Sequence, residues 1–378
     1  MYNVLTLNKI SKVGLAKLPT DLYNVADEQN SPDAILLRSF KMHDMELPES
    51  LLAVARCGAG VNNIPLDKCA EKGIVVFNTP GANANAVKEL VLTALLISSR
   101  KIVESYNWAQ ALKGTEGVAA AVEKGKSQFA GPEITGKTLG IVGLGAIGVL
   151  VANAAVALGM NVIGYDPFLS VNGALRINSA VKYTTNLDDI FANSDYITVH
   201  VPLTPDTKEL VCKESIAKMK DGVRIINLAR GELVNIADVK EALESGKVAK
   251  YVTDFPNEDA VGVDGIITLP HLGASTPEAE DNCAIMAANE MREYLENGNI
   301  INSVNYPACS LARTGKNRVC VLYKNSDDMV SKITAVVSAS DMVSKTRGDF
   351  GYAIIDTDAD VDASAITAIA GVIKVRVL

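Results

Sequence analysis

A glycine-rich turn places the strongest constraint on what this chain can fold into. Gly143, Gly145 and Gly148 form the pattern G-x-G-x-x-G. The apolar run 139–142 before the turn is typical of a buried strand, and the Ala- and Val-rich run 146–158 after it predicts a helix. Strand, glycine turn and helix in this order are the setting of a dinucleotide-binding fold, in which the helix N-terminus faces the pyrophosphate.

An acid about 20 residues downstream completes this pattern. Asp166 ends the next strand-like run, where a carboxylate can accept hydrogen bonds from the ribose hydroxyls. The same carboxylate repels the 2′-phosphate of NADP, Pro167 follows it, and no Arg occurs from Gly164 to Leu169. The sequence therefore favours NAD as the cofactor.

Composition excludes several other classes of protein. The chain has 378 residues, enough for two or three domains, and a net charge of −8 without a basic run, so nucleic acid is not an expected partner. No apolar run reaches membrane-spanning length and the N-terminus lacks a signal-peptide layout, so we expect a cytoplasmic protein without a membrane partner. Six scattered cysteines and three histidines show no metal-ligand spacing, so no metal is expected.

The order of apolar runs predicts the fold class. Strand-like runs alternate with helix-like segments up to residue 300, which predicts an α/β fold with parallel sheets. About 100 residues of this pattern precede the glycine turn and need a sheet of their own, so we expect a first domain before the cofactor domain. The helix-like run 86–99 is expected to cross between them. The predicted strands are 34–37, 54–57, 75–78, 140–142, 162–165, 196–201, 224–228 and 266–269.

The last 60 or so residues have a different pattern. They predict strand, helix, two strands, helix and strand, the β-α-β-β-α-β order of a ferredoxin-like unit, after a linker at 314–316. The expected elements are strand 318–323, helix 327–337, strands 342–345 and 352–355, helix 364–370 and strand 372–378.

Three polar residues that follow strand-like runs are candidates for catalysis. Each has an ordinary structural explanation: Arg230 as a surface cation, Glu258 as a solvated loop acid, His271 as a capping or core histidine. Together they suit hydride transfer to an α-keto acid. Arg230 can hold the substrate carboxylate with its planar fork, and His271 can exchange the proton at the ketone oxygen while Glu258 supports the imidazolium.

Many segments in one order resemble the D-isomer-specific 2-hydroxyacid dehydrogenase family. They include Arg56-Cys-Gly-Ala-Gly-Val-Asn-Asn63, Gly73–Pro80, Gly136–Gly148, His200–Pro205, Asn227–Gly231, Pro270–Thr276 and Asn302–Pro307. The resemblance implies two Rossmann-like domains with the active site in the cleft between them, and it places the catalytic Arg, Glu and His on the three candidates above. The implied domains are a substrate-binding domain at 1–92 and 276–310, an NAD-binding domain at 93–275 and an ACT-like domain at 316–378.

The resemblance also implies binding residues. Cofactor contacts fall on Gly143, Gly145, Ala146, Ile147, Gly148, Asp166, Pro167, His200, Pro202, Ala229, Asp254 and Gly273. Substrate contacts fall on Arg38, Ser39, Lys41, Gly60, Val61 and Arg230. Arg38 and Lys41 would supply the cations that a phosphate needs, although a strand-end Arg beside a solvated Lys is an alternative interpretation.

The implied activity is NAD-dependent oxidation of 3-phosphoglycerate to 3-phosphohydroxypyruvate, the first step of L-serine biosynthesis, by a homodimer or homotetramer. A reductase of glyoxylate, hydroxypyruvate or another D-2-hydroxyacid is the alternative, and the ACT-like tail argues against a non-enzymatic NAD-sensing co-repressor. Asp327 and Asp328 stand where serine-sensing relatives carry Pro-Gly, so we do not expect strong serine feedback.

Overall fold

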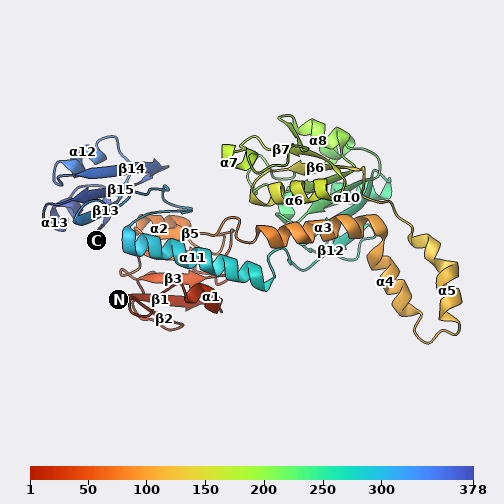
Figure 1. Cartoon of the computed structure of the whole chain (residues 1–378), viewed down its shortest axis with the longest axis horizontal. Helices are drawn as coiled ribbons and strands as arrows, with labels where there is room; N and C mark the ends of the chain where they lie inside the picture. The colour runs from red at the N-terminus through yellow and green to blue at the C-terminus, as the bar shows by residue number, and fades with distance from the viewer. The chain divides into compact units, whose positions relative to one another are not determined.

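The computed structural model describes residues 1–378, and the chain divides into two compact units (Figure 1). The first unit comprises Met1–Asn83 and Pro277–Leu378, and the second comprises Ala84–Thr276. None of the helices combines the length with the apolar character that crossing a bilayer requires. All six cysteines are free, and no group of three His, Cys, Asp or Glu side chains is placed to hold a metal ion.

The first unit contains a five-stranded parallel sheet of order β2-β1-β3-β4-β5. Its central strand β3 reads Ala-Ile-Leu-Leu and is buried along its whole length, as expected for a parallel strand covered on both faces. The elements are β1 (Tyr2–Leu7), α1 (Lys12–Leu15), β2 (Tyr23–Ala26), β3 (Ala34–Leu37), β4 (Ala53–Arg56), α2 (Leu66–Glu71), β5 (Val75–Phe77) and the long helix α11 (Pro277–Asn297).

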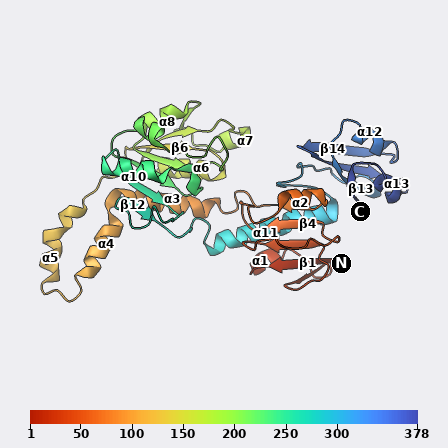
Figure 2. The ribbon, with the colours of Figure 1, turned by 180° about the vertical axis from the view of Figure 1, so that it is seen from behind.

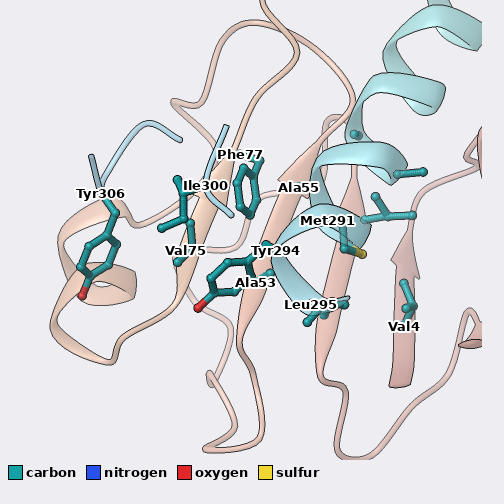
Figure 3. Close-up of a cluster of buried hydrophobic side chains, with 14 of the residues drawn as sticks. Val4, Ala53, Ala55, Val75, Phe77, Met291, Tyr294, Leu295, Ile300 and Tyr306 are labelled. Atoms are coloured by element: carbon teal, nitrogen blue, oxygen red, sulfur yellow. The ribbon is translucent and has the colours of Figure 1, made fainter. Parts of the chain in front are cut away.

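Helix α11 supplies one side of this unit's core. Met291, Tyr294 and Leu295 point from the helix toward the sheet, where Phe77 and Ala55 meet them (Figure 3). The Phe77 and Tyr294 rings lie 5.8 Å apart between centroids. Helix α11, which returns to the unit late in the sequence, therefore covers one face of the sheet formed by the first 80 or so residues.

A four-stranded antiparallel sheet follows in the same unit, with the order β14-β15-β13-β16. The predicted β-α-β-β-α-β sequence of elements is confirmed, although both helices are shorter than expected. Alternate residues of strand β13 face opposite sides of this sheet. Val319 and Val321 pack against the helices α12 and α13, whereas Cys320 and Leu322 join the core beneath α11. The elements are β13 (Asn317–Lys324), α12 (Met329–Thr334), β14 (Asp341–Arg347), β15 (Phe350–Thr357), α13 (Ala363–Thr367) and β16 (Val372–Val377).

The second unit is a doubly wound α/β domain with a seven-stranded parallel sheet of order β12-β11-β10-β9-β6-β7-β8. The strand order reverses between the neighbours β6 and β9. Ligands of such sheets bind outside the carboxyl ends of the strands at that point. One face packs on α3 and α6, and the other on α8, α9 and α10. The elements are α3 (Ala84–Arg100), β6 (Thr138–Val142), α6 (Ala146–Ala157), β7 (Asn161–Tyr165), α7 (Val171–Ala174), β8 (Lys182–Thr184), α8 (Leu187–Asn193), β9 (Tyr196–Val199), α9 (Lys213–Ala217), β10 (Val223–Asn227), η2 (Gly231–Leu233), α10 (Ile236–Glu244), β11 (Val248–Thr253) and β12 (Ile266–Thr268).

A helical arm, residues 102–129, leaves the second unit after α3. It consists of α4 (Ile102–Ala111), α5 (Val118–Gly125) and the 3-10 turn η1 (Lys126–Phe129), and none of these elements has a buried residue. Both views show the arm extending away from the sheet of its own unit (Figures 1 and 2). Sequence reasoning did not predict this arm.

Candidate active site

The glycine turn has the backbone geometry that its sequence predicts. Gly143 has φ 97° and a Cβ there would lie 2.6 Å from the His200 carbonyl oxygen, so a side chain does not fit. A Cβ on Gly148 would lie 1.9 Å from the Gly143 carbonyl oxygen, which explains how α6 approaches β6 so closely. At Gly145 a Cβ would meet nothing within 4 Å, so this face of the turn is open.

The N-terminus of α6 is left free for an anion. Gly145 is its N-cap and provides no side-chain hydrogen bond, and the first turn carries no acid. Gly145 and Ala146 are exposed and Ile147 is half-buried. Uncapped N–H groups at a helix N-terminus bind phosphate well, so the turn fits the pyrophosphate of a dinucleotide.

Asp166 connects the glycine turn to the end of β7. Its Oδ2 accepts a hydrogen bond from the Leu144 N–H at 2.9 Å, and its Oδ1 accepts one from the Phe168 N–H at 2.8 Å. A carboxylate oxygen can accept a further bond, so the group can order the turn and still receive a ribose hydroxyl. Pro167 beside it is exposed.

His200 lies beside the same turn, at the end of β9. Its Nε2 lies 3.0 Å from the Thr198 hydroxyl, whereas its Nδ1 is buried and has no hydrogen-bond partner. Burial lowers the pKa of His200 to about 4, so the ring is neutral at neutral pH. Buried polar atoms normally have a hydrogen-bond partner, so a buried nitrogen without one beside the glycine turn fits a site for a polar cofactor. Pro202, two residues further on, is exposed.

Asn227 shapes the loop that presents Arg230. This buried amide ends β10; its Nδ2 donates to the Arg230 carbonyl at 2.8 Å and its Oδ1 accepts from the Ala229 N–H at 3.1 Å. The Arg230 side chain is exposed, and its Nη1 donates to the Ala229 carbonyl at 2.6 Å. No carboxylate of the second unit forms an ion pair with Arg230, so the guanidinium can take an anionic ligand.

Asp254 and His271 meet at the next strand ends. The Asp254 carboxyl is buried; Oδ2 accepts from the Gly273 N–H at 3.0 Å, and Oδ1 has no partner. Burial raises the pKa of Asp254, and the Gly273 N–H and the charges of His271 and Arg230 oppose that rise. The backbone N–H of His271 donates to the backbone carbonyl of Asp254 at 2.9 Å. His271 itself has φ 50°, a left-handed backbone conformation that is uncommon outside glycine.

The structure does not join Glu258 to His271. Glu258 is exposed in a turn ordered by Asn257, whose Oδ1 accepts from the Ala260 N–H at 2.9 Å. No hydrogen bond or ion pair connects the Glu258 carboxylate to the imidazole, whose ring instead packs on Phe255 with 4.9 Å between centroids. The expected pairing therefore stays a prediction, and Asp254 is the buried carboxylate whose field acts on His271.

In the first unit, the loop after β3 carries the predicted phosphate contacts. The Asn8 Oδ1 accepts hydrogen bonds from three successive backbone N–H groups, those of Arg38, Ser39 and Phe40, at 3.2, 3.0 and 2.9 Å. Asn63 donates from Nδ2 to the Arg38 and Phe40 carbonyls at 3.3 and 2.7 Å. Sequence reasoning gave no role to either asparagine, although Asn63 lies in one of the segments that resemble the family.

The polar side chains of this loop differ in whether they have a partner. Arg38 forms an ion pair with Glu280 of α11, whereas Ser39 and Lys41 are exposed and Lys41 has no acidic partner in the unit. Gly60 and Val61 are half-buried, and within the unit their N–H groups donate no hydrogen bond. Free N–H groups next to a fixed loop are suited to a carboxylate.

The fold and the glycine turn define an NAD-binding α/β protein. The family model described as the D-isomer specific 2-hydroxyacid dehydrogenase NAD binding domain matches residues 92–275. The D-3-phosphoglycerate dehydrogenase of Escherichia coli K12 is 32% identical over 351 residues, covering 87% of this chain and 82% of the relative. The chain therefore belongs to the D-isomer specific 2-hydroxyacid dehydrogenase family.

Two further similarities support this placement. The D-3-phosphoglycerate dehydrogenase of Archaeoglobus fulgidus is 36% identical over 289 residues, which is 73% of this chain. The chain spans only 52% of that relative's length. Among solved structures, a glyoxylate reductase from Paecilomyes thermophila has a TM-score of 0.65 and 28% identity, covering 80% of this chain and 98% of that one.

Proposed function

We propose that this chain catalyses NAD-dependent oxidation of 3-phosphoglycerate to 3-phosphohydroxypyruvate, the first step of L-serine biosynthesis. The observation that carries the proposal is the position of Arg230, which has no ion-pair partner, near His271 and the buried Asp254 carboxyl, at the same strand-end edge as the glycine turn. The relatives named D-3-phosphoglycerate dehydrogenase support the choice of substrate. The second unit would bind NAD, and the first would supply the substrate contacts.

The proposed roles follow from what each side chain can do. Arg230 holds the substrate carboxylate, with the Gly60 and Val61 N–H groups as further donors. Arg38 and Lys41 receive the phosphate. His271 accepts the proton of the C2 hydroxyl as the bond to oxygen becomes double. When bound, NAD accepts the hydride that leaves C2.

The supporting groups orient these residues. Asp254 holds the Gly273 segment by its hydrogen bond, and its carboxyl interacts with the charges of His271 and Arg230. Asn227 fixes the Arg230 loop. Glu258 is retained as a proposed partner of His271 in the substrate-bound enzyme, because catalytic contacts often tighten only in that state.

Reduction of an unphosphorylated keto acid is the second candidate. It is favoured by the Arg38–Glu280 ion pair, which already occupies the cation that a phosphate would need. One assay panel separates the two candidates: NAD reduction with 3-phosphoglycerate, and NADH oxidation with phosphohydroxypyruvate, hydroxypyruvate, glyoxylate and pyruvate. We expect the highest kcat/KM with phosphohydroxypyruvate, and a higher value with glyoxylate or hydroxypyruvate would overturn the proposal.

We further propose that the chain works as a homo-oligomer assembled through the helical arm. Ile102, Val103, Tyr106 and Val118 expose between 40% and 62% of their surface on helices that bury nothing in this chain. Apolar side chains gathered on an otherwise unpacked element mark an interface. A second copy is the proposed occupant.

The C-terminal sheet is proposed to be an ACT-like domain, residues 316–378. Its support is the antiparallel order β14-β15-β13-β16 with two helices on one face.

A further inference from the structure

We propose that Glu280 sets substrate preference by occupying the Arg38 guanidinium, so that a phosphorylated substrate must displace this carboxylate in order to bind. The proposal rests on the function proposed above, in which Arg38 receives the substrate phosphate. It makes Glu280 a specificity-determining residue, distinct from the residues that perform hydride and proton transfer.

Hydrogen bonds on both sides hold the main chain at Arg38. Asn8 binds three N–H groups of this loop, and Asn63 and Arg56 bind the Arg38 carbonyl, the latter through Nε at 3.0 Å. Bonds to both its donors and its acceptors restrain the backbone of this loop. Binding of an anion to Arg38 is therefore a competition between two anions for one fixed cation, without a rearrangement of the backbone.

The competing carboxylate is held weakly enough to be displaced. Arg38 and Glu280 keep 36% and 47% of their side-chain surface exposed, and partly exposed ion pairs contribute little stability. A phosphate group carries up to two negative charges and several acceptor oxygens, so it binds a guanidinium more strongly than one carboxylate does. An unphosphorylated keto acid carries only its carboxylate, which Arg230 holds in the proposed function, so it has no second anionic group for Arg38.

The displaced carboxylate has other cations available. Glu280 lines a pocket of about 790 Å³ together with Lys9 and Lys12. The pocket's other acids are Asp27 and Asp281, and Asp281 already accepts a hydrogen bond from the Ser11 hydroxyl. Lys9 and Lys12 therefore supply positive charge in the same pocket as the Glu280 carboxylate.

The competition predicts a selective effect of neutralising Glu280. In Glu280→Gln, the KM ratio of hydroxypyruvate to phosphohydroxypyruvate should rise about two- to fivefold, the factor that corresponds to a partly exposed ion pair. The matched control is Glu278→Gln, because Glu278 is an exposed acid in the same first turn of α11 and has no cationic partner. This control should keep the wild-type ratio.

A double-mutant cycle completes the experiment. In an Arg38→Ala background, Glu280→Gln should no longer change the ratio, because the contested cation is absent. An equal KM change for both substrates, a change that persists without Arg38, or the same change in Glu278→Gln would each overturn the inference. If the wild-type chain does not turn over phosphohydroxypyruvate, the proposed function fails. The inference is then tested by the inhibition constant of phosphohydroxypyruvate against hydroxypyruvate, which Glu280→Gln should still lower.

Discussion

At the residue scale, His271 is the side chain on which the proposed proton transfer depends. His271→Ala should lower kcat by about 10²–10⁴, because a positioned acid or base contributes a factor of that size. NADH should still bind, since the glycine turn is untouched. Initial rates and a fluorescence titration with NADH measure the two effects. His43→Ala, at an exposed histidine of the first unit, is the control. Near-normal turnover of His271→Ala would remove His271 from the reaction.

Asp254 offers a separate test of the residues around His271. Asp254→Asn removes the buried charge whose field acts on His271 and Arg230. In the pH–rate profile for 3-phosphoglycerate oxidation, the acidic limb should then move to lower pH, because a protonated imidazole loses its stabilising neighbour. Glu258→Gln is the comparison variant. If only Glu258→Gln moves the profile, Glu258 and not Asp254 is the working partner.

Glu290 predicts a pH dependence of stability. The residue is buried in the first unit, its Oε1 accepts from the Asn302 amide at 2.6 Å, and burial raises its pKa to about 8. In the unfolded chain a glutamate releases its proton near pH 4.3, so stability should fall as pH rises from about 4 through about 8. Glu290→Gln cannot ionise and should flatten this slope. Denaturant unfolding at several pH values measures it, with Glu278→Gln as control; an unchanged slope would contradict the assignment.

Residues that act across long sequence separations set the limit of prediction from the sequence. The glycine turn, Asp166 and Arg230 were found because each stands at a fixed offset from a strand. Asn8 and Glu280 bind Arg38 across 30 and 242 residues of sequence. Nothing in a single sequence reports such pairing, since an asparagine after a strand and an acid in a first helical turn are both common.

At the element scale, strands buried on both faces and the helix of the glycine turn were predictable because their apolar runs are continuous. β3 matches the predicted range 34–37, and α6 ends one residue before the predicted end at 158. The helical arm was not predicted, because its apolar residues face no core in this chain. Its only aromatic packing is internal, between Trp108 and Phe129 with 5.2 Å between ring centroids.

The arm carries the element-scale prediction. Ile102→Asp combined with Tyr106→Asp places charges on its exposed apolar surface, so an oligomer formed through the arm should dissociate to the 40.0 kDa chain. Light scattering after gel filtration measures the mass. Leu175→Asp, at a residue 79% exposed on another helix end, is the control. An unchanged oligomer in the double variant would place the interface elsewhere.

At the scale of the whole molecule, the C-terminal sheet is built into the first unit. Arg318 is fully buried, binds both Asp356 oxygens at 2.7 and 2.9 Å, and donates from Nη1 to the Asn297 carbonyl at the end of α11. The Tyr352 hydroxyl donates to the Gly298 carbonyl in the same turn. These bonds satisfy carbonyls that the end of a helix leaves without partners.

Breaking the Arg318–Asp356 pair should therefore weaken more than the C-terminal sheet. Burial raises the pKa of Asp356, but the Arg318 hydrogen bonds outweigh it and hold that pKa at about 2. Arg318→Ala leaves a buried carboxylate without its cation, which costs about 3–5 kcal/mol. Denaturant unfolding should show the loss in the first unit, and Arg313→Ala, at an exposed arginine nearby, should show little. Independent unfolding of the C-terminal sheet alone would contradict this view.

Serine regulation must accordingly be tested on the intact chain, because deleting residues 316–378 would expose the core beneath α11. The loop before α12 holds Asp327 and Asp328; the Asp328 carboxylate binds Lys332 at 2.6 Å, and Asp327 has no cationic partner. An amino-acid effector needs backbone N–H groups near its carboxylate, and like charges at the loop repel that carboxylate. We therefore expect L-serine at millimolar concentration to inhibit weakly or not at all. Initial rates against serine concentration measure this. Strong inhibition of the intact chain that is lost in a variant altered only at this loop would make the C-terminal sheet a serine sensor and refute the prediction.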